Sequence, residues 1–298
     1  MSIEAVVPTQ LAEAAQVLCA AAFGADPART DLPCAKSAVE SWHRAVALGG
    51  QGHYARAHTE LDRVAVLPGG DPVLRSLAAN TRASWWRQLG WHRRAASWDG
   101  AALRLAGCGL AGSGLAERGR HAECDALVGL AADALGQRRL PLAARLLERG
   151  RPDEAVGDFD ETVGDFDETV GDFHALRVRI RWHWVAAEIA MAGGDAPAAV
   201  AAAQRSVELA AVGPSTRHRV KSDLVRAAAG VVAGDSSAVG AVARVHQRCV
   251  VCGLLPLQWA AALLWAGVAD GAQRRSALAD AQDCATELAR RGGRPRAG

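Results

Sequence analysis

Basic side chains recur at alternate positions in two stretches of the chain. Guanidinium and ammonium groups bind carboxylates and phosphates, so a basic face attracts an acidic peptide or another polyanion. Ordinary solvated arginine faces give the same pattern, and the spacing alone leaves both explanations open. The partner-binding candidates are Arg177, Arg179, Arg181, His183, Arg217, Arg219 and Lys221, together with the adjacent tryptophans Trp85 and Trp86.

A glycine-rich hexapeptide, GCGLAG, begins at Gly107 and matches the spacing of dinucleotide-binding loops. That chemistry needs a strand before the loop and a helix after it, so that the pyrophosphate meets a helix N-terminus. A helical pattern precedes Gly107, and no strand–helix–strand pattern occurs in the sequence. We therefore expect a loop between two helices, and no cofactor.

Cys249 and Cys252 form a CVVC motif, with His246 three residues before it. A structural zinc site needs a second pair of ligands, and a redox-active pair gains reactivity at a helix N-terminus. This pair lies at the end of a predicted helix, so the sequence favours buried core cysteines over metal binding or redox chemistry. Five histidines lie near predicted turns or on polar faces, and surface or capping roles are expected for them: His43, His53, His58, His92 and His121. Since the chain also lacks H-E-x-x-H, P-loop and G-x-S-x-G motifs, we predict no catalytic or metal-binding residues and no enzyme.

The segment from Pro152 to Phe173 carries nine carboxylates and no Lys or Arg, although the whole chain has a net charge of +2. It contains the heptapeptide VGDFDET twice, at residues 156–162 and 163–169. Val163 and Thr169 stand where a calcium-binding EF-hand loop needs Gly and Glu, so the acidic repeat does not match that loop. Gly and Thr in each heptad oppose a helix. We expect an acidic insert at 153–173, either a protruding loop or a weak helical extension.

The cysteines and the hydropathy of the chain indicate the cellular compartment in which the protein is expected. The seven cysteines are odd in number, which argues against a disulfide framework and favours a reducing cytosol. The first ten residues lack the basic and apolar regions of a signal peptide. The longest apolar run, Trp259 to Ala269, is too short to cross a bilayer. We expect a cytoplasmic protein with no membrane insertion.

Apolar residues recur at helical spacing through most of the chain. From Asp71 to Gly107 the pattern predicts a helical hairpin, with Asp71 as N-cap, Pro72 in the first turn and Gly90 at the bend. Residues 176–184 alternate with a strand period, but a lone strand would have no partner, and a helix is favoured. The other predicted helices cover residues 9–23, 38–48, 55–67, 123–135, 140–148, 175–192, 198–211, 216–232, 236–252, 258–270 and 272–291, with a glycine-rich loop at 107–119 and a loose tail after Arg291.

Five turn glycines lie 38, 46, 58 and 40 residues apart, which is typical of helical-hairpin repeats. An Ala follows about five residues after the turn, with small or apolar residues four and seven positions further on. Asp99 is an exception to this pattern. The pattern is carried by Gly52 with Ala57, Leu61 and Val64, by Gly90 with Ala95 and Ala102, and by Gly194 with Ala199, Ala203 and Ser206.

This pattern resembles the tetratricopeptide repeat over roughly residues 38–290, and the chain is similar to uncharacterised tetratricopeptide-like proteins of high-GC bacteria. The resemblance implies an all-α solenoid of about six degenerate helical hairpins, a right-handed superhelix whose first helices line a concave groove, and no catalysis. The carboxylate clamp of that family uses Asn and Lys residues, whereas this chain has a single Asn, Asn80. We expect an N-terminal segment at 1–30 and one repeat domain at 31–298.

These observations predict a non-catalytic protein–protein interaction scaffold or adaptor with a partly basic groove. The expected partner is a protein or an acidic peptide. Three alternatives stay open: a nucleic-acid or other polyanion binder, the sensor part of a regulatory system, and an enzyme with a pocket that spacing does not reveal. A homodimer formed through the apolar last unit is also compatible with the sequence.

Overall fold

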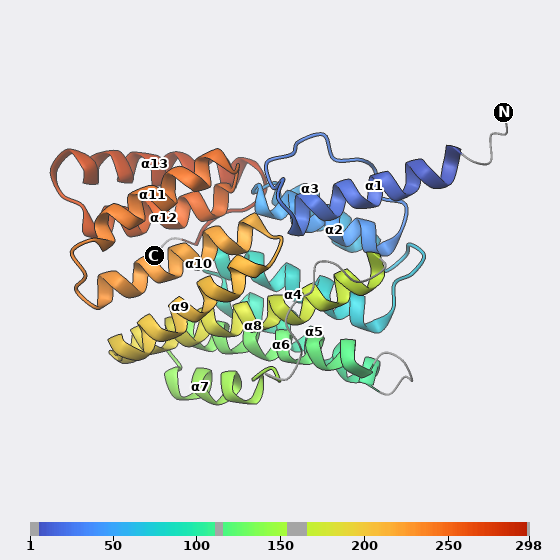
Figure 1. The fold of residues 1–298 in the computed structure, drawn as a ribbon, viewed down its shortest axis with the longest axis horizontal. Coiled ribbons are helices and arrows are strands. Elements are labelled where there is room, and N and C mark those ends of the chain that lie inside the picture. Colours follow the sequence, from blue (N-terminus) through green and yellow to red (C-terminus); the bar gives the residue numbers. More distant parts are fainter. Residues whose placement is uncertain (1–5, 111–115, 154–165, 297–298) are drawn as a thin grey trace.

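The computed structural model describes residues 6–110, 116–153 and 166–296, and every regular element in these ranges is an α-helix (Figure 1). The predicted all-α class is confirmed. Most of the acidic insert lies outside the described residues, although its last part begins a helix at Phe166. The helices are α1 (Val6–Phe23), α2 (Ala38–Gly50), α3 (Tyr54–Arg63), α4 (Pro72–Gln88), α5 (His92–Leu110), α6 (Ala116–Gly136), α7 (Leu140–Arg149), α8 (Phe166–Gly193), α9 (Ala196–Val212), α10 (Thr216–Val232), α11 (Ala238–Val251), α12 (Leu255–Val268) and α13 (Gly271–Arg290).

Polar side chains cap several helices where the sequence predicts their starts. Asp71 accepts a hydrogen bond from the backbone N–H of Leu74 at 2.7 Å, and Ser215 accepts one from that of His218 at 3.4 Å. Such caps satisfy backbone donors that have no partner in the first helical turn. Ser37 and Asp195 cap α2 and α9 in the same way.

Glycine permits the tight turns between paired helices, because a left-handed backbone costs it no steric strain. At the third hairpin Gly136 ends α6, and Arg138 instead adopts the left-handed conformation, with φ of 61°. The other predicted turn glycines have φ between 75° and 83°: Gly52, Gly90, Gly194 and Gly234.

From α2 onward the helices pack as consecutive hairpins, α2 with α3 through to α12 with α13. The first helices of successive hairpins also pack on one another, in the order α2, α4, α6, α8, α10 and α12. In Figure 1 the α1–α3 end and the α11–α13 end both lie at the top, with α4–α9 below them. The first helices therefore form a continuous inner layer.

Helix α8 contains the alternating stretch that has a strand period in the sequence. Leu176, Val178 and Ile180 are buried within it, and Trp184 is nearly so, at 7% exposure. Because Arg177 is also buried and the side chain of Arg181 is only 11% exposed, a core-facing surface extends around much of this helix. The preference for a helix is confirmed.

The glycine-rich stretch differs from the prediction. Helix α5 continues through Gly107 to Leu110, and α6 already begins at Ala116, so the predicted loop at 107–119 is too long. Gly107 meets no atom that a methyl group would touch, and it fits a helix without strain. Residues 111–115 lie outside the described part of the chain.

The predicted loose tail after Arg291 is instead bound to the first hairpins. The backbone N–H of Ala55 donates to the Arg291 carbonyl at 2.9 Å, and that of Arg296 donates to the Leu89 carbonyl at 2.8 Å. Trp91 Nε1 donates to the Arg294 carbonyl at 3.0 Å. The last hairpin is thereby joined to α3 and to the α4–α5 turn.

Deleting residues 291–298 is expected to lower the free energy of unfolding by about 2–3 kcal/mol, because several hydrogen bonds of about 1 kcal/mol each are lost. Gly293→Ala should act in the same direction, since its methyl group would overlap the Tyr54 ring. Urea unfolding measures both changes. Gly107→Ala is the control and should be neutral or slightly stabilising; equal effects at the two glycines would contradict a bound tail.

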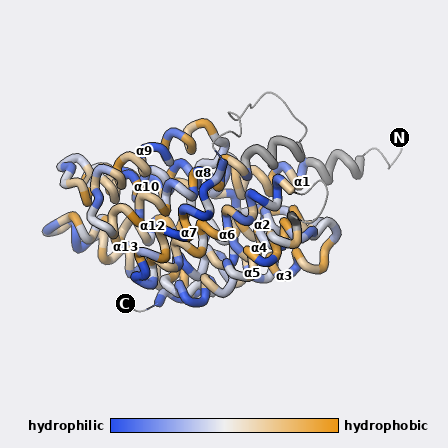
Figure 2. Tube along the Cα trace, turned by 90° about the horizontal axis from the view of Figure 1, so that it is seen from below, coloured by the Kyte–Doolittle hydropathy of each residue, from blue (hydrophilic) through white to orange (hydrophobic). Residues whose placement is uncertain are grey.

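In the described part of the chain, no helix is both long enough and apolar enough to cross a bilayer. Hydrophobic and hydrophilic residues are mixed along the helices, as Figure 2 shows. This mixture is typical of amphipathic helices that bury one face.

Candidate functional site

A central cleft of about 460 Å³ lies among the first helices. Every first helix from α2 to α12 contributes to its wall, as the repeat resemblance implies for a groove. Its volume falls within the range of about 300–1,000 Å³ that is usual for small-molecule sites. Its lining residues include Phe23, Val46, Asn80, Trp85, Arg87, His92, Arg177, Arg181, Trp184, Glu188, Met191, Arg217, His218, Lys221, Leu224, Val225, Ala228, Pro256, Leu257 and Ala260.

Helix α8 presents Arg177 and Arg181 to the cleft, one helical turn apart. Both guanidinium groups donate to the carboxylate of Asp125 on α6, which is fully buried. Arg181 also donates to Asn80 Oδ1 at 2.7 Å. Burial lowers the pKa of Arg177 to about 10 and that of Arg181 to about 9, so both stay charged at neutral pH. The two guanidinium groups thus share one counter-charge, the carboxylate of Asp125.

A second buried charge cluster lies behind Arg87 of α4. Arg87 donates to the carboxylates of Asp99 and Asp133, at 2.8 Å in the case of Asp133. Asn80 Nδ2 donates to Asp99 Oδ1 at 2.9 Å. Burial, together with the charge of Asp133, raises the pKa of Asp99 to about 8 against the opposing effect of Arg87. Arg87 thereby joins two buried carboxyl groups, Asp99 of α5 and Asp133 of α6.

Helix α10 presents a second pair of cations, Arg217 and Lys221, also one turn apart. Arg217 donates to the Val46 carbonyl at 3.3 Å, near the C-terminus of α2. The Lys221 ammonium lies 4.7 Å from the centre of the Trp184 ring. Neither cation forms an ion pair with any described residue. Burial lowers the pKa of Arg217 to about 10, and it also lowers the pKa of Lys221.

Apolar side chains cover the wall beside the α10 cations. Leu224 and Val225 follow on the next turn of α10, and Leu257 and Ala260 extend this wall onto α12. Together these residues form a surface that an aliphatic group could contact. The cleft therefore combines a positive charge with an apolar wall.

The two tryptophans of the cleft have their ring faces or edges occupied. The Trp184 ring stacks on His218, with ring centres 5.4 Å apart, and Lys221 lies over it. Trp85 is buried and packs against the rings of Tyr54 and His58, with ring centres 5.9 and 5.0 Å apart. Neither ring is arranged as an open stacking platform.

The sequence predicts a surface or capping role for His43, and the structure shows that this prediction is wrong. The residue is only 1% exposed, and its ring centre lies 5.7 Å from that of Phe23 and 5.2 Å from that of Trp42. Burial lowers its pKa to about 4. His43 is therefore a neutral core residue.

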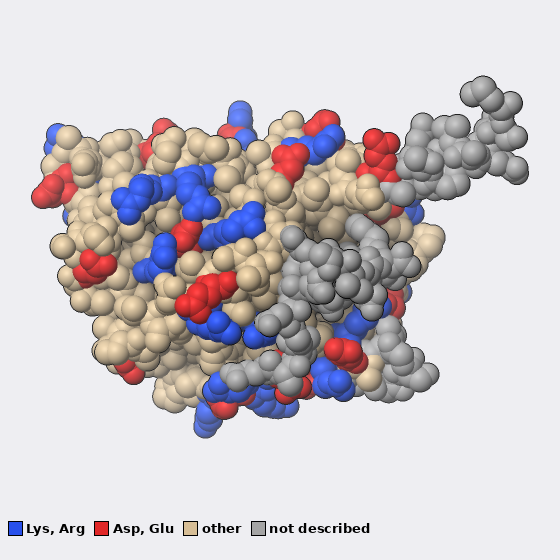
Figure 3. All heavy atoms as spheres, in the orientation of Figure 1, with Lys and Arg blue, Asp and Glu red and all other residues tan. Residues whose placement is uncertain are grey.

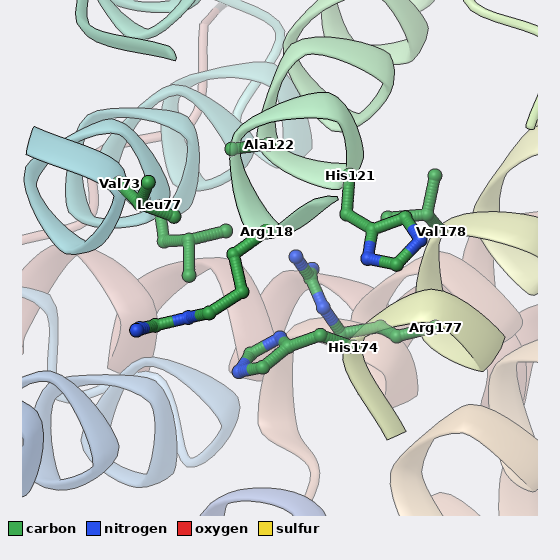
Figure 4. A pocket seen from close by; sticks show the side chains of 8 residues that line it. All are labelled: Val73, Leu77, Arg118, His121, Ala122, His174, Arg177 and Val178. Atoms are coloured by element: carbon green, nitrogen blue, oxygen red, sulfur yellow. The ribbon is translucent and has the colours of Figure 1, made fainter. Parts of the chain in front are cut away.

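A second, much smaller pocket of about 20 Å³ lies where α8 meets α4 and α6. Figure 4 shows the side chains of Arg118, His121, His174 and Arg177 around it. His174 Nδ1 is buried and has no hydrogen-bond partner among the described residues. The volume holds about one water molecule, so this pocket is not a ligand site of any size.

The structure brings some of the predicted site residues together and leaves others apart. Arg177, Arg181, Arg217, Lys221 and Trp85 line the central cleft, whereas Arg179, His183, Arg219 and Trp86 are not among its lining residues. Trp86 instead lies under Arg94, which is 3.8 Å from its ring centre, and Arg219 donates to the Gly213 carbonyl at 2.6 Å.

On the face shown in Figure 3, Lys and Arg side chains gather over the α10–α12 part of the molecule, with Asp and Glu among them. The face thus carries mixed charge. Some exposed arginines of α10 and α11 are paired with a carboxylate, since Asp223 pairs with both Arg226 and Arg248.

The CVVC cysteines lie at the end of α11. Cys249 is fully buried, and burial raises the pKa of its thiol to about 12, which disfavours a reactive thiolate. His246 faces Asp280, with 3.2 Å between Nε2 and Oδ2. Among the described residues, no three His, Cys, Asp or Glu side chains are grouped to hold a metal ion.

Comparisons by sequence found no matching protein-family model and no matching curated protein. We therefore infer the function of this protein from the geometry of the cleft.

Proposed function

We propose that this protein is a non-catalytic interaction scaffold or adaptor, built as an α-solenoid of six degenerate tetratricopeptide-like hairpins, whose partner inserts an acidic segment into the central cleft. One observation carries the proposal: all six first helices line a single cleft, and two of them present paired cations to it. Cations at the centre of a concave surface favour a negatively charged partner.

The buried ion pairs divide the basic residues by role. Arg177 and Arg181 hold α8 to α6 through Asp125, so they support the shape of the cleft. Arg217 and Lys221 have no such partner among the described residues and are free to meet a ligand. The partner would therefore contact α10 more than α8.

A pull-down from the native cytosol tests this proposal. Ala228→Trp fills the cleft from α10, and Ala201→Trp places the same side chain on the exposed face of α9 as a matched control. We expect a protein that the wild type and Ala201→Trp retain and that Ala228→Trp loses. Circular dichroism of both variants checks that the fold is kept.

Two other outcomes would overturn the proposal. A protein retained equally by both variants would place its binding surface outside the cleft. Nucleic acid in the eluate, with a steep loss at higher salt, would favour the polyanion-binding alternative; the mixed surface charge in Figure 3 does not favour it. A cleft of this size also suits the sensor part of a regulatory system, which would bind a small ligand rather than a protein.

A further inference from the structure

The charges around the central cleft do not balance. Arg177 and Arg181 share the single carboxylate of Asp125, and Arg87 contacts Asp99 and Asp133. Glu188 is the one carboxylate on the described wall of the cleft; its charge favours the charged form of Lys221, but it forms no ion pair with Lys221 or Arg217. The five cations Arg87, Arg177, Arg181, Arg217 and Lys221 thus face four carboxylates. A positive charge is thus left over beside α10.

An uncompensated cation in a cleft is costly, because it loses hydration without gaining a counter-charge. Arg217 and Lys221 are four residues apart on α10, so both groups lie on one face of the helix. The guanidinium group of Arg217 has five N–H donors, and its hydrogen bond to the Val46 carbonyl uses one of them. The remaining donors and the Lys221 ammonium could bind one small anionic group together.

The surroundings indicate what that anion would be attached to. The wall next to the cations, from Leu224 to Ala228 on α10 and from Pro256 to Ala260 on α12, contributes mostly aliphatic groups to the cleft. This wall matches a hydrocarbon chain better than a peptide backbone, whose N–H and C=O groups would find no partners on the wall itself. A nucleobase would find no open ring, because His218 and Lys221 occupy the Trp184 ring.

We propose that Arg217 and Lys221 bind the carboxylate of an aliphatic monocarboxylic acid, whose hydrocarbon chain lies against Leu224, Val225 and Leu257. The inference rests on the proposed function in one respect, namely that the central cleft is the binding site. It adds a small-molecule ligand that competes with the partner for the same cleft.

Calorimetry and thermal unfolding with decanoate test the inference, with decanamide as the uncharged analogue. We expect saturable decanoate binding that raises Tm, and decanamide binding about tenfold to a hundredfold weaker, as expected for the loss of charged hydrogen bonds. Equal binding of the two compounds, or no decanoate binding, would overturn it.

Variants of α10 locate the site. Lys221→Met should weaken decanoate binding about tenfold or more while raising the Tm of the free protein, since it removes an unpaired cation from the cleft. Arg226→Gln is the control, because Arg226 is exposed on the same helix and pairs with Asp223. A lower Tm for Lys221→Met with unchanged decanoate binding would make Lys221 structural and would contradict the proposal.

A peptide probe separates this inference from the proposed function. N-acetyl-leucyl-leucine carries the same carboxylate on a peptide backbone. If it binds and decanoate does not, the aliphatic-acid inference fails while a peptide-binding scaffold is supported. If decanoate binds but no protein is lost from the pull-down with Ala228→Trp, the scaffold fails and the small-ligand site stands.

Discussion

Replacing Asp125 with alanine is expected to lower the free energy of unfolding by about 3–5 kcal/mol, the usual range for removing one partner of a buried ion pair. The variant leaves Arg177 and Arg181 buried beside the cleft without their counter-charge. It also removes the ion pairs that join α8 to α6. Urea unfolding at neutral pH measures the loss.

The chain offers a matched control at its surface. Asp223 also pairs with two arginines, Arg226 and Arg248, but their side chains are 50% and 47% exposed. Water and salt screen such pairs, so Asp223→Ala should cost about 1 kcal/mol or less. Equal losses for the two alanine variants would show that Asp125 does not hold the inner layer together.

Replacing His43 with leucine is expected to change how stability depends on pH. The pKa of His43 is about 4 in the folded protein, below the ordinary value of 6.5, because the ring is buried. The folded state therefore binds fewer protons than the unfolded chain between these values, and stability falls as pH falls. Between pH 7 and pH 5, the free energy of unfolding of the wild type should fall by about 2 kcal/mol more than that of His43→Leu.

The measurement is the difference in unfolding free energy between wild type and variant at each pH. Other groups cancel in that difference, including Asp99, whose raised pKa of about 8 favours the folded state at low pH and so acts in the opposite direction. Val46→Ala, a non-titrating change on the same helix, should show a difference that is independent of pH. A constant difference for His43→Leu would mean that its ring is solvated in the folded protein.

The helices were predictable because their signals are local. Asp71 and Ser215 cap helices where the sequence places them, and glycines at the hairpin turns adopt the left-handed conformation that favours this residue. The alternating stretch of α8 was predicted as a helix because a lone strand would have no partner. Signals that depend on a residue and its near neighbours therefore identified the elements.

The cleft was only partly predictable, since its partners are far apart in sequence. The pairing of Asp125 with Arg177 and Arg181 joins the first helices of two successive hairpins across 52 and 56 residues of sequence, and no spacing rule indicates it. One signal was present: Asp99 breaks the small-residue pattern of its hairpin, and it proves to be buried against Arg87. A charged residue on the inner face of a helix indicates a buried partner elsewhere.

The same reasoning explains the missed tail and the missed histidine. Residues 292–296 have loop composition, and only their hydrogen bonds to the first hairpins order them. His43 is buried because Phe23 and Trp42 enclose it, and the polar character of the residue suggested the opposite. In both cases tertiary contacts outweighed a local preference.

The bound tail sets a limit on how this chain can lengthen. An open array of hairpins gains a unit at no cost to its neighbours, because each unit contacts only the adjacent ones. Here the residues after α13 bind Ala55 and Leu89, so an added hairpin would move the tail away from its partners. New sequence is tolerated more easily in a connection between two helices. The first VGDFDET copy lies between α7 and α8, and the second runs into the start of α8 at Phe166. We therefore expect homologues to differ in length at this connection while keeping the same number of hairpins.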